Sequence, residues 1–338
     1  MSEQYPIDFV VTWVDGNDPV WQKEKAKYSP NKNADNRNVR FRDWDNMQYW
    51  FRAVEKFAPW VNKIHFVTYG HLPKWLNTDN PKLNIAKHSD FIPKQYLPTF
   101  SSRSIEFNLH RINNLSERFV YFNDDMFLLK SVPEKLFFAG KDCLPTDFAI
   151  TSTLSIADKK DTVQYAKFNN IVILNSHFDK KEQMKKNLNK WINLAYGWNA
   201  LRNLIFGGQH HFRGFANNHL AFSYLKSEIE DLWNKEFDEL NNTCLHKFRC
   251  RDDVNQWLIR YWQLAKGKFI PIGRHVKGKV YEVYNGVEQN QELFKIIENQ
   301  SMPMICINDN DNVDFEPMKN RIKEAFNKIL PDKSSFEK

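Results

Sequence analysis

Two adjacent carboxylates follow an apolar stretch near the middle of the chain. Residues 118–122 read Arg-Phe-Val-Tyr-Phe, and Asn123, Asp124 and Asp125 come directly after them. A short apolar run that stops at polar residues is typical of a buried strand ending at a turn. Ionised carboxylates beside a core are costly unless a cation or hydrogen bonds compensate them. We therefore predict that Asp124 and Asp125 bind a hard divalent cation, Mg²⁺ or Mn²⁺, and a helix cap beside a solvated acid is the alternative.

A second polar pair, Asn308 and Asp309, follows a short apolar run at residues 304–307. Ligands in α/β proteins bind beyond the carboxyl ends of the strands, so two separate strand ends can supply one site. Carboxylate and amide oxygens are suitable ligands for the same kind of cation. We predict that Asn308 and Asp309 complete the metal site.

A third acidic segment ends the first apolar run, residues 7–14, with Asp15, Gly16, Asn17 and Asp18. Exposed acids and amides at a strand end suit a ribose, a base edge or a metal-bound phosphate. Gly16 is expected to supply the positive φ that a tight turn can require. We assign Asp15 to catalysis and the other three residues to substrate binding. The alternative is an Asp-Gly turn without a functional role.

Composition excludes several classes of protein. The chain has 338 residues, a formal charge of +7, and neither GxGxxG nor GxxxxGK[ST], which argues against dinucleotide and P-loop chemistry. Its four cysteines form no CxxC pair, so no zinc ribbon is indicated. The positive charge suits nucleic acid, anionic lipid headgroups or phosphorylated substrates. There is no signal-peptide pattern and no apolar stretch long enough to span a membrane, so a cytoplasmic protein is expected.

Alternating strand and helix patterns predict the fold. Strands are expected at residues 7–14, 63–69, 83–87, 118–122, 279–284 and 304–307, and helices at 43–57, 105–115, 227–237 and 253–265. The polar residues from about Tyr28 to Val39 are expected to form a loop. This alternation favours a Rossmann-like, mostly parallel α/β sheet with a helical insertion. We predict a nucleotide-sugar-binding portion at 1–175, a mainly helical portion at 176–270, a return to the core at 271–330, and a frayed tail at 331–338.

A long basic helix is predicted from His177 to Leu204. Tryptophans and aliphatic residues alternate there with Lys180, Lys185 and Lys190. Such a helix can rest on the anionic inner face of a membrane or hold a polyanionic acceptor. An ordinary amphipathic helix with a solvated basic face is the alternative.

Four regions of the chain resemble the Stealth family of sugar-phosphate transferases. The first is residues 11–18, Val-Thr-Trp-Val-Asp-Gly-Asn-Asp. The second begins at residues 40–43, Arg-Phe-Arg-Asp, and continues through 57–61 (Phe-Ala-Pro-Trp-Val), 97–102 (Leu-Pro-Thr-Phe-Ser-Ser) and 122–125 (Phe-Asn-Asp-Asp). The third is similar at residues 218–226, 245–249 and 253, and the fourth at 306–309, Cys-Ile-Asn-Asp.

The family includes bacterial capsule and exopolysaccharide enzymes and the animal N-acetylglucosamine-1-phosphotransferase of lysosomal targeting. The resemblance implies a metal-dependent glycosyltransferase-like (GT-A) sheet. It also implies transfer of a sugar-1-phosphate from a nucleotide sugar, a UDP-linked hexose or N-acetylhexosamine, to a hydroxyl of a growing or lipid-linked polysaccharide. The product is a phosphodiester, and UMP leaves.

The resemblance also suggests roles for individual residues. Phosphoryl transfer depends on positioning and on neutralising charge, so it needs cationic side chains and a base. His219 is the first candidate for the base and His246 for orienting a phosphate, while structural histidines are the alternative. The guanidinium groups of Arg249 and Arg42 match the geometry of a phosphate. Glu106 and His110 are expected on one helix face, where they would bind donor hydroxyls or brace a catalytic group. The other candidates for substrate binding are Asn46, Ser101, Ser102, Arg111 and Lys226.

Two other functions stay open from the sequence. A glycosyltransferase would use the same acids and metal but would attack the anomeric carbon and release UDP. A basic nucleic-acid-binding module is the second alternative, although no zinc spacing, helix-turn-helix or RNP-like strand supports it. No nucleic-acid partner is therefore expected.

Overall fold

The computed structural model describes residues 5–29, 41–156, 158, 161–310 and 312–338. The expected loop from Tyr28 to Val39 lies outside these residues except for Tyr28 and Ser29, and so does Arg40 of the second family-like region. The central sheet has five strands in the order β3-β2-β1-β4-β8. Their bounds are β1 Ile7–Thr12, β2 Ile64–Thr68, β3 Leu83–Lys87, β4 Arg118–Phe122 and β8 Phe222–Leu225.

The first four of these strands are parallel, and β8 is antiparallel to β4 at the edge. This confirms the expected mostly parallel α/β sheet. The remaining strands form two small sheets. One contains β10 (Gly278–Glu282), β11 (Met304–Asn308) and β5 (Met126–Leu128), and the other β6 (Phe138–Ala139), β7 (Leu144–Asp147) and β9 (Ile270–Pro271).

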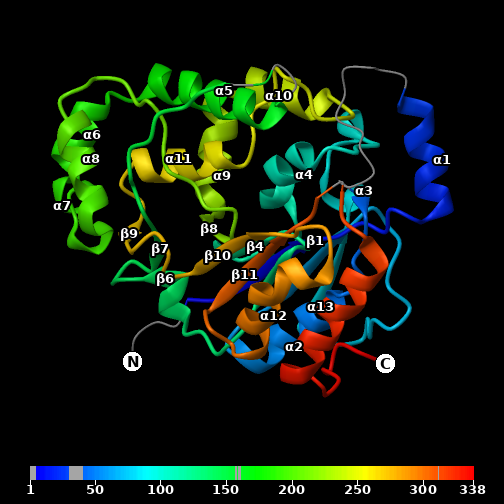
Figure 1. Ribbon diagram of the computed structural model, residues 1–338. Helices are drawn as coiled ribbons and strands as arrows, with labels where there is room; N and C mark the ends of the chain where they lie inside the picture. Colours follow the sequence, from blue (N-terminus) through cyan, green and yellow to red (C-terminus); the bar gives the residue numbers. More distant parts are fainter. Residues whose placement is uncertain (1–4, 30–40, 157, 159–160, 311) are drawn as a thin grey trace.

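Helices cover both faces of the central sheet, which explains why its strands read as continuous apolar runs. Phe9 and Val11 of β1 pack into one core cluster, and Val10 between them packs into the other. Figure 1 shows the two layers. The first contains α2 (Met47–Phe57), α12 (Gln291–Glu298) and α13 (Phe315–Ile329), and the second α4 (Ser102–Asn108), α5 (Thr162–His177), α9 (Lys226–Lys235), α10 (Phe237–Leu245) and α11 (Trp257–Ala265).

The expected long basic helix is wrong. Residues 177–204 contain the end of α5 and then α6 (Lys180–Lys186), α7 (Leu188–Trp191), the 3₁₀ segment η5 (Leu194–Asn199) and most of α8 (Ala200–Phe206). Asn187 leaves the helical conformation between α6 and α7, and Gly197 takes a left-handed φ of 53° within η5. Asparagine and glycine are weak helix formers, so the basic pattern continues across several short helices. The two other helices are α1 (Pro19–Tyr28) and α3 (His88–Phe91).

The expected frayed tail is also wrong. Phe336 is 3% exposed, and its ring lies 5.2 Å from that of Phe51 on α2. Both carboxylate oxygens of Glu337 accept hydrogen bonds from Arg52, at 2.8 and 2.7 Å. A buried aromatic ring and a bidentate ion pair together hold the segment against the first helical layer.

We expect Phe336→Ala to lower the free energy of unfolding by about 3–5 kcal/mol, because it leaves a cavity against Phe51. Urea unfolding of the whole chain measures this loss. Phe237→Ala is the matched control, since Phe237 is 54% exposed and its truncation removes little packing. Equal losses in the two variants would contradict the docked tail.

Candidate active site

A cavity of about 470 Å³ lies at the carboxyl end of the central sheet. It brings together side chains from distant parts of the chain. The predicted site residues that line it are Arg42, Asn46, Ser102, Glu106, Asp124, Asp125, His219, Arg249, Asn308 and Asp309.

Strand register explains why these residues meet. Asp124 follows β4, and His219 precedes β8, whose Phe222 pairs with Tyr121 of β4. Because β8 runs antiparallel to β4, the residues before β8 lie at the edge where β4 ends. On the other side, β11 pairs with β5, and the Ile307 amide donates to the Asp125 carbonyl at 2.8 Å. Asn308 therefore lies beside Asp124 and Asp125.

Asp125 has one oxygen in contact and one without a partner. Its Oδ2 lies 3.4 Å from His219 Nε2 and accepts a hydrogen bond from the Cys306 thiol at 3.3 Å. Its Oδ1 is buried and has no hydrogen-bond partner among the described residues. A cation would satisfy such an oxygen. Asp125, His219 and Cys306 also lie close enough together to offer ligands to a softer metal such as zinc.

Asp124 lies in a strongly negative environment. Burial and, to a smaller extent, the neighbouring carboxylates of Asp125, Asp43 and Asp309 together raise its pKa to about 8. Like charges gathered in a buried site favour a bound cation. Asp124, the free oxygen of Asp125 and the amide oxygen of Asn308 are of the type that Mg²⁺ or Mn²⁺ prefers, so the residues present fit such an ion.

Asp309 already has a cationic partner. Arg42 Nε donates to Asp309 Oδ2 at 2.9 Å, and Arg42 Nη2 donates to Oδ1 at 2.5 Å. The guanidinium also lies over the Phe315 ring, 4.4 Å from its centroid. Two residues that the sequence assigned to separate roles, metal and substrate, are thus paired with each other. The pair closes one side of the cavity.

Glu106, His219 and Arg249 also line the cavity. Burial raises the pKa of Glu106, while Arg249 and Ser102 oppose this shift. Burial lowers the pKa of His219, but the charges of Asp125 and Glu106 outweigh it and the net shift is upward. Arg249 Nη2 donates to Ser102 Oγ at 2.9 Å. A cation, a carboxylate and an imidazole therefore line the same cavity as the acidic cluster, and the imidazole contacts Asp125.

A smaller cavity of about 140 Å³ adjoins the large one and shares Ser102, Asn123, Asp124 and Arg249 with it. Its other walls are largely aromatic, from Trp13, Trp21, Phe41 and Phe100. We call this cavity the aromatic slot, and aromatic walls next to charged groups suit a planar ring attached to phosphates.

The Asp15 turn lies outside both of these cavities. Asp18 caps α1 by accepting from the Trp21 amide at 2.7 Å, and Asp15 Oδ1 accepts from the Asn17 amide at 2.9 Å. Gly16 and Asn17 line a separate hollow beside α1. The expected positive φ at Gly16 is wrong: a Cβ there would lie 1.8 Å from the Phe41 carbonyl oxygen, so close backbone contact requires the glycine.

Four other predicted residues lie away from the cavity. Burial and then Arg111 lower the pKa of His110 to about 3, and its ring faces Trp233. Arg111 also lies over that Trp233 ring. The expected shared face of Glu106 and His110 is absent because α4 ends at Asn108 and a tighter 3₁₀ turn follows. Lys226 lies beyond the opposite end of β8, beside the start of β4, and Ser101 is buried beneath the cavity wall.

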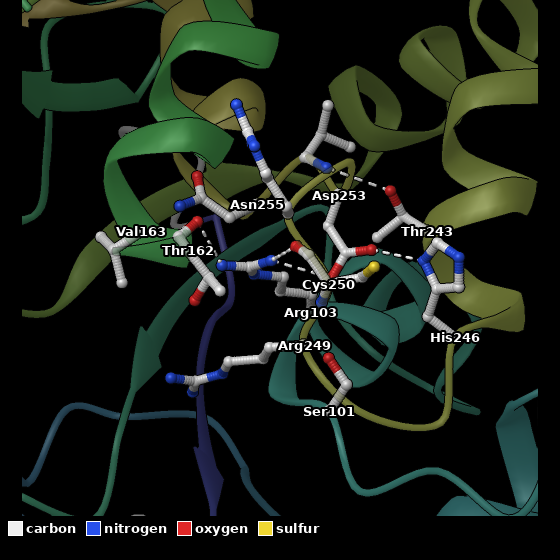
Figure 2. A network of polar contacts seen from close by, with 12 residues as sticks. Ser101, Arg103, Thr162, Val163, Thr243, His246, Arg249, Cys250, Asp253 and Asn255 are labelled. Carbon is white, nitrogen blue, oxygen red and sulfur yellow. Dashed lines mark hydrogen bonds and ion pairs between the residues drawn. The ribbon is translucent and has the colours of Figure 1, made fainter. Parts of the chain in front are cut away.

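His246 belongs to a supporting network shown in Figure 2. Its Nδ1 lies 2.6 Å from Asp253 Oδ1, and Arg103 Nη1 donates to Asp253 Oδ2 at 2.8 Å. Arg103 also donates to the carbonyls of Cys250 and Thr162, while Arg249 points away from this network. His246 therefore does not line the cavity, and its role is in holding the chain around Arg249.

Several residues of the site received no functional role from the sequence. Three of them fall within the family-like regions but received no role: Arg103, Asp43 and Cys306. Each is next in sequence to, or near, a residue that was assigned, and this proximity could have identified them. Asn255, Gln256 and Trp257 also line the cavity, and no sequence pattern marks them.

Comparisons with known proteins agree with the family-like regions. A family model for Stealth protein conserved region 1 matches residues 5–33, and one for conserved region 2 matches residues 40–144. These matches contain the first two regions quoted above. The third and fourth regions lie outside both models.

Full-length relatives cover the rest of the chain. A capsular polysaccharide phosphotransferase, WcwK, of Streptococcus pneumoniae is 42% identical over 100% of both chains. A receptor polysaccharide phosphotransferase, WefC, of Streptococcus gordonii is 39% identical over 98% of each chain. An exopolysaccharide phosphotransferase, cps2G, of Lactiplantibacillus plantarum is 37% identical over 100% of this chain and 98% of its own.

The contact between His246 and Asp253 should make the free energy of unfolding depend on pH. The hydrogen bond to Asp253 raises the pKa of His246 above 6.5, although burial opposes it. A raised folded-state pKa stabilises the protein fully below pH 6.5, and this contribution is lost as pH rises through the folded-state pKa. We expect His246→Gln to lower the free energy of unfolding by about 1–2 kcal/mol at low pH and by less at high pH. Urea unfolding of both proteins across this range measures the difference, and a difference that does not change with pH would contradict the prediction.

Proposed function

The chain belongs to the Stealth family of polysaccharide phosphotransferases, and from this we propose that it transfers a sugar-1-phosphate from a nucleotide sugar to a hydroxyl of a growing or lipid-linked polysaccharide. The chain is a transferase enzyme, as its full-length relatives are named. One observation carries the finer proposal. Asp124, Asp125, Asn308, His219 and Arg249 line a single cavity, and His219 Nε2 lies 3.4 Å from Asp125 Oδ2. Together these side chains offer what phosphoryl transfer requires: metal ligands, a base and a cation.

The proposed donor is UDP-linked, with a hexose or N-acetylhexosamine as its sugar. Support comes from the aromatic slot beside the cavity, in which Trp13, Trp21 and Phe100 would enclose the planar base. The slot shares Arg249 and Asp124 with the main cavity, so a base in the slot would place the diphosphate next to both.

The proposed cofactor is Mg²⁺ or Mn²⁺, held by Asp124, Asp125 and Asn308. When bound, such an ion neutralises the charge of the donor diphosphate. Asp309 would act through Arg42, which it holds at the rim by two hydrogen bonds. We assign Asp309 to positioning for this reason, and Arg42 to contact with the substrate.

In the proposed reaction, the oxygen of the acceptor hydroxyl attacks the phosphorus that carries the sugar. A new O–P bond forms, the bond from that phosphorus to the bridging oxygen breaks, and UMP leaves with the bonding electrons. His219 Nε2 takes the hydroxyl proton, and Asp125 and Glu106 stabilise the resulting imidazolium. Arg249 balances charge on the transferred phosphoryl group.

A glycosyltransferase reaction in the same cavity is the alternative. The acidic cluster serves both reactions, so the nucleotide product decides between them. We expect incubation with a panel of nucleotide sugars, Mg²⁺ and an acceptor glycan to release UMP, and EDTA to stop the release. Chromatography of the products measures this result, and stoichiometric release of UDP would overturn the proposed reaction.

Asp124 provides a second test. Loss of a group outside the ligand shell commonly costs 10–100-fold in metal affinity or activity, so we expect Asp124→Asn to lower turnover at least about 100-fold. Asp45→Asn is the matched control, because Asp45 is 59% exposed and pairs with Lys323 outside the cavity. Turnover by Asp124→Asn equal to that of the control would exclude the metal assignment.

A further inference from the structure

An exposed apolar surface lies on η5 and α8, and we call these residues, 194–206, the apolar cap. Leu194 is 98% exposed, Trp198 88% and Ile205 73%, and Leu201 and Leu204 on α8 are about half exposed. Trp198, Leu201 and Ile205 are spaced three and four residues apart, so they follow one side of the segment. Folded proteins seldom leave large side chains together in water unless they contact something there.

The exposure is built into the fold, because polar contacts fix the apolar cap. The buried amide of Asn203 donates to the carbonyls of Ala149 and Trp191 and accepts from the Thr151 amide. Lys180 is fully buried and donates to the Phe206 carbonyl, and burial lowers its pKa to about 8. In Figure 1, α6, α7 and α8 stand together at one end of the molecule, opposite α1.

The surroundings of the apolar cap are positively charged. Residues 183–227 and 267–281 contain no Asp or Glu, and the second segment packs against the first, where Lys190 donates to the Gly267 carbonyl. Lys185, Lys186 and Arg202 are exposed on α6 and α8. Apolar side chains bordered by cations, with a tryptophan at the boundary, are typical of protein surfaces that lie in a membrane interface.

A basic cavity of about 240 Å³ opens beside the apolar cap. Asn199 and Arg202 of the cap line it, together with Lys167 on α5 and Arg274. No carboxylate lines it among the described residues. The carboxylate of Asp161 interacts electrostatically with Lys167, and its Oδ1 caps α5 by accepting from the Val163 and Gln164 amides. The cavity is therefore suited to a phosphate group.

We propose that the apolar cap inserts into the interface of an anionic lipid bilayer and that the basic cavity receives a lipid phosphate group. This surface goes beyond the proposed reaction. Apolar contact alone would suit a second copy of the chain, but two such caps would bring their exposed lysines and arginines together without acids to offset them. Charge complementarity therefore favours anionic lipid.

The basic cavity lies next to the active site. Val163 lines the large cavity, and its neighbour Gln164 lines the basic one. Arg274 donates to Asn218, the residue before His219, at 3.1 Å. If the proposed function holds, a lipid-linked acceptor with its phosphate in the basic cavity would direct its glycan toward His219.

Co-sedimentation of the full chain with lipid vesicles tests the proposal without donor or acceptor, so its outcome is independent of the reaction. We expect binding to phosphatidylcholine vesicles that contain phosphatidylglycerol and little binding to phosphatidylcholine alone. Leu194→Ser combined with Trp198→Ser should weaken binding at least about tenfold. Replacing Lys185 and Lys186 by Gln should weaken it roughly fivefold for each charge, and Lys167→Gln should reduce the preference for phosphatidylglycerol.

Phe237→Ser is the control, because Phe237 is exposed but lies on α10, outside the apolar cap. It should bind vesicles as the parent chain does. Binding that survives in the Leu194→Ser and Trp198→Ser variant would overturn the proposal. A second result would also overturn it: the parent chain binds no vesicles and forms a dimer in light scattering, and the Leu194→Ser and Trp198→Ser variant is a monomer.

Discussion

The accumulation of negative charge at one edge of the central sheet is the constraint on which the site depends. Burial raises the pKa of Asp124 there, and repulsion from the carboxylates of Asp125, Asp43 and Asp309 contributes to the same shift. Arg42 offsets Asp309 with two hydrogen bonds, but Asp125 keeps an oxygen without a partner among the described residues. Arg42 therefore offsets part of the negative charge of the cluster, and the proposed cation would offset more of it.

Strand direction explains how this cluster acquires its partners. The parallel strand β4 delivers the acids, the antiparallel β8 returns the chain so that His219 lies beside them, and β11 adds Asn308 through its pairing with β5. A second set of buried contacts, among Arg103, Asp253 and His246, fixes the segment that carries Arg249. Asp253 and His246, which do not line the cavity, thus help to hold in place residues that do.

Basic residues of the region after α5 have two distinct uses. Lys180 donates to the Phe206 carbonyl and joins α6 to α8, and Lys190 of α7 donates to the Gly267 carbonyl, while Lys185, Lys186 and Arg202 are exposed. The helices that they fasten carry the apolar cap. Among the described residues, no helix is long and apolar enough to cross a bilayer. The proposed membrane contact is made by the exposed side chains of the apolar cap.

The sequence by itself determined four of the five strands of the central sheet, the family and the acids at the ends of β4 and β11, because apolar periodicity and adjacent residues are local properties. The edge strand β8 was not predicted. Only the tertiary structure decided which assigned residues share the cavity. Lys226 and His219 lie close in sequence, yet β8 separates them along its length, and the end of α4 at Asn108 turns His110 away from Glu106. Arg42 and Asp309 are far apart in sequence and form a pair. Strand direction and the positions of helix ends set the distances between these side chains, and the residue types alone determine neither.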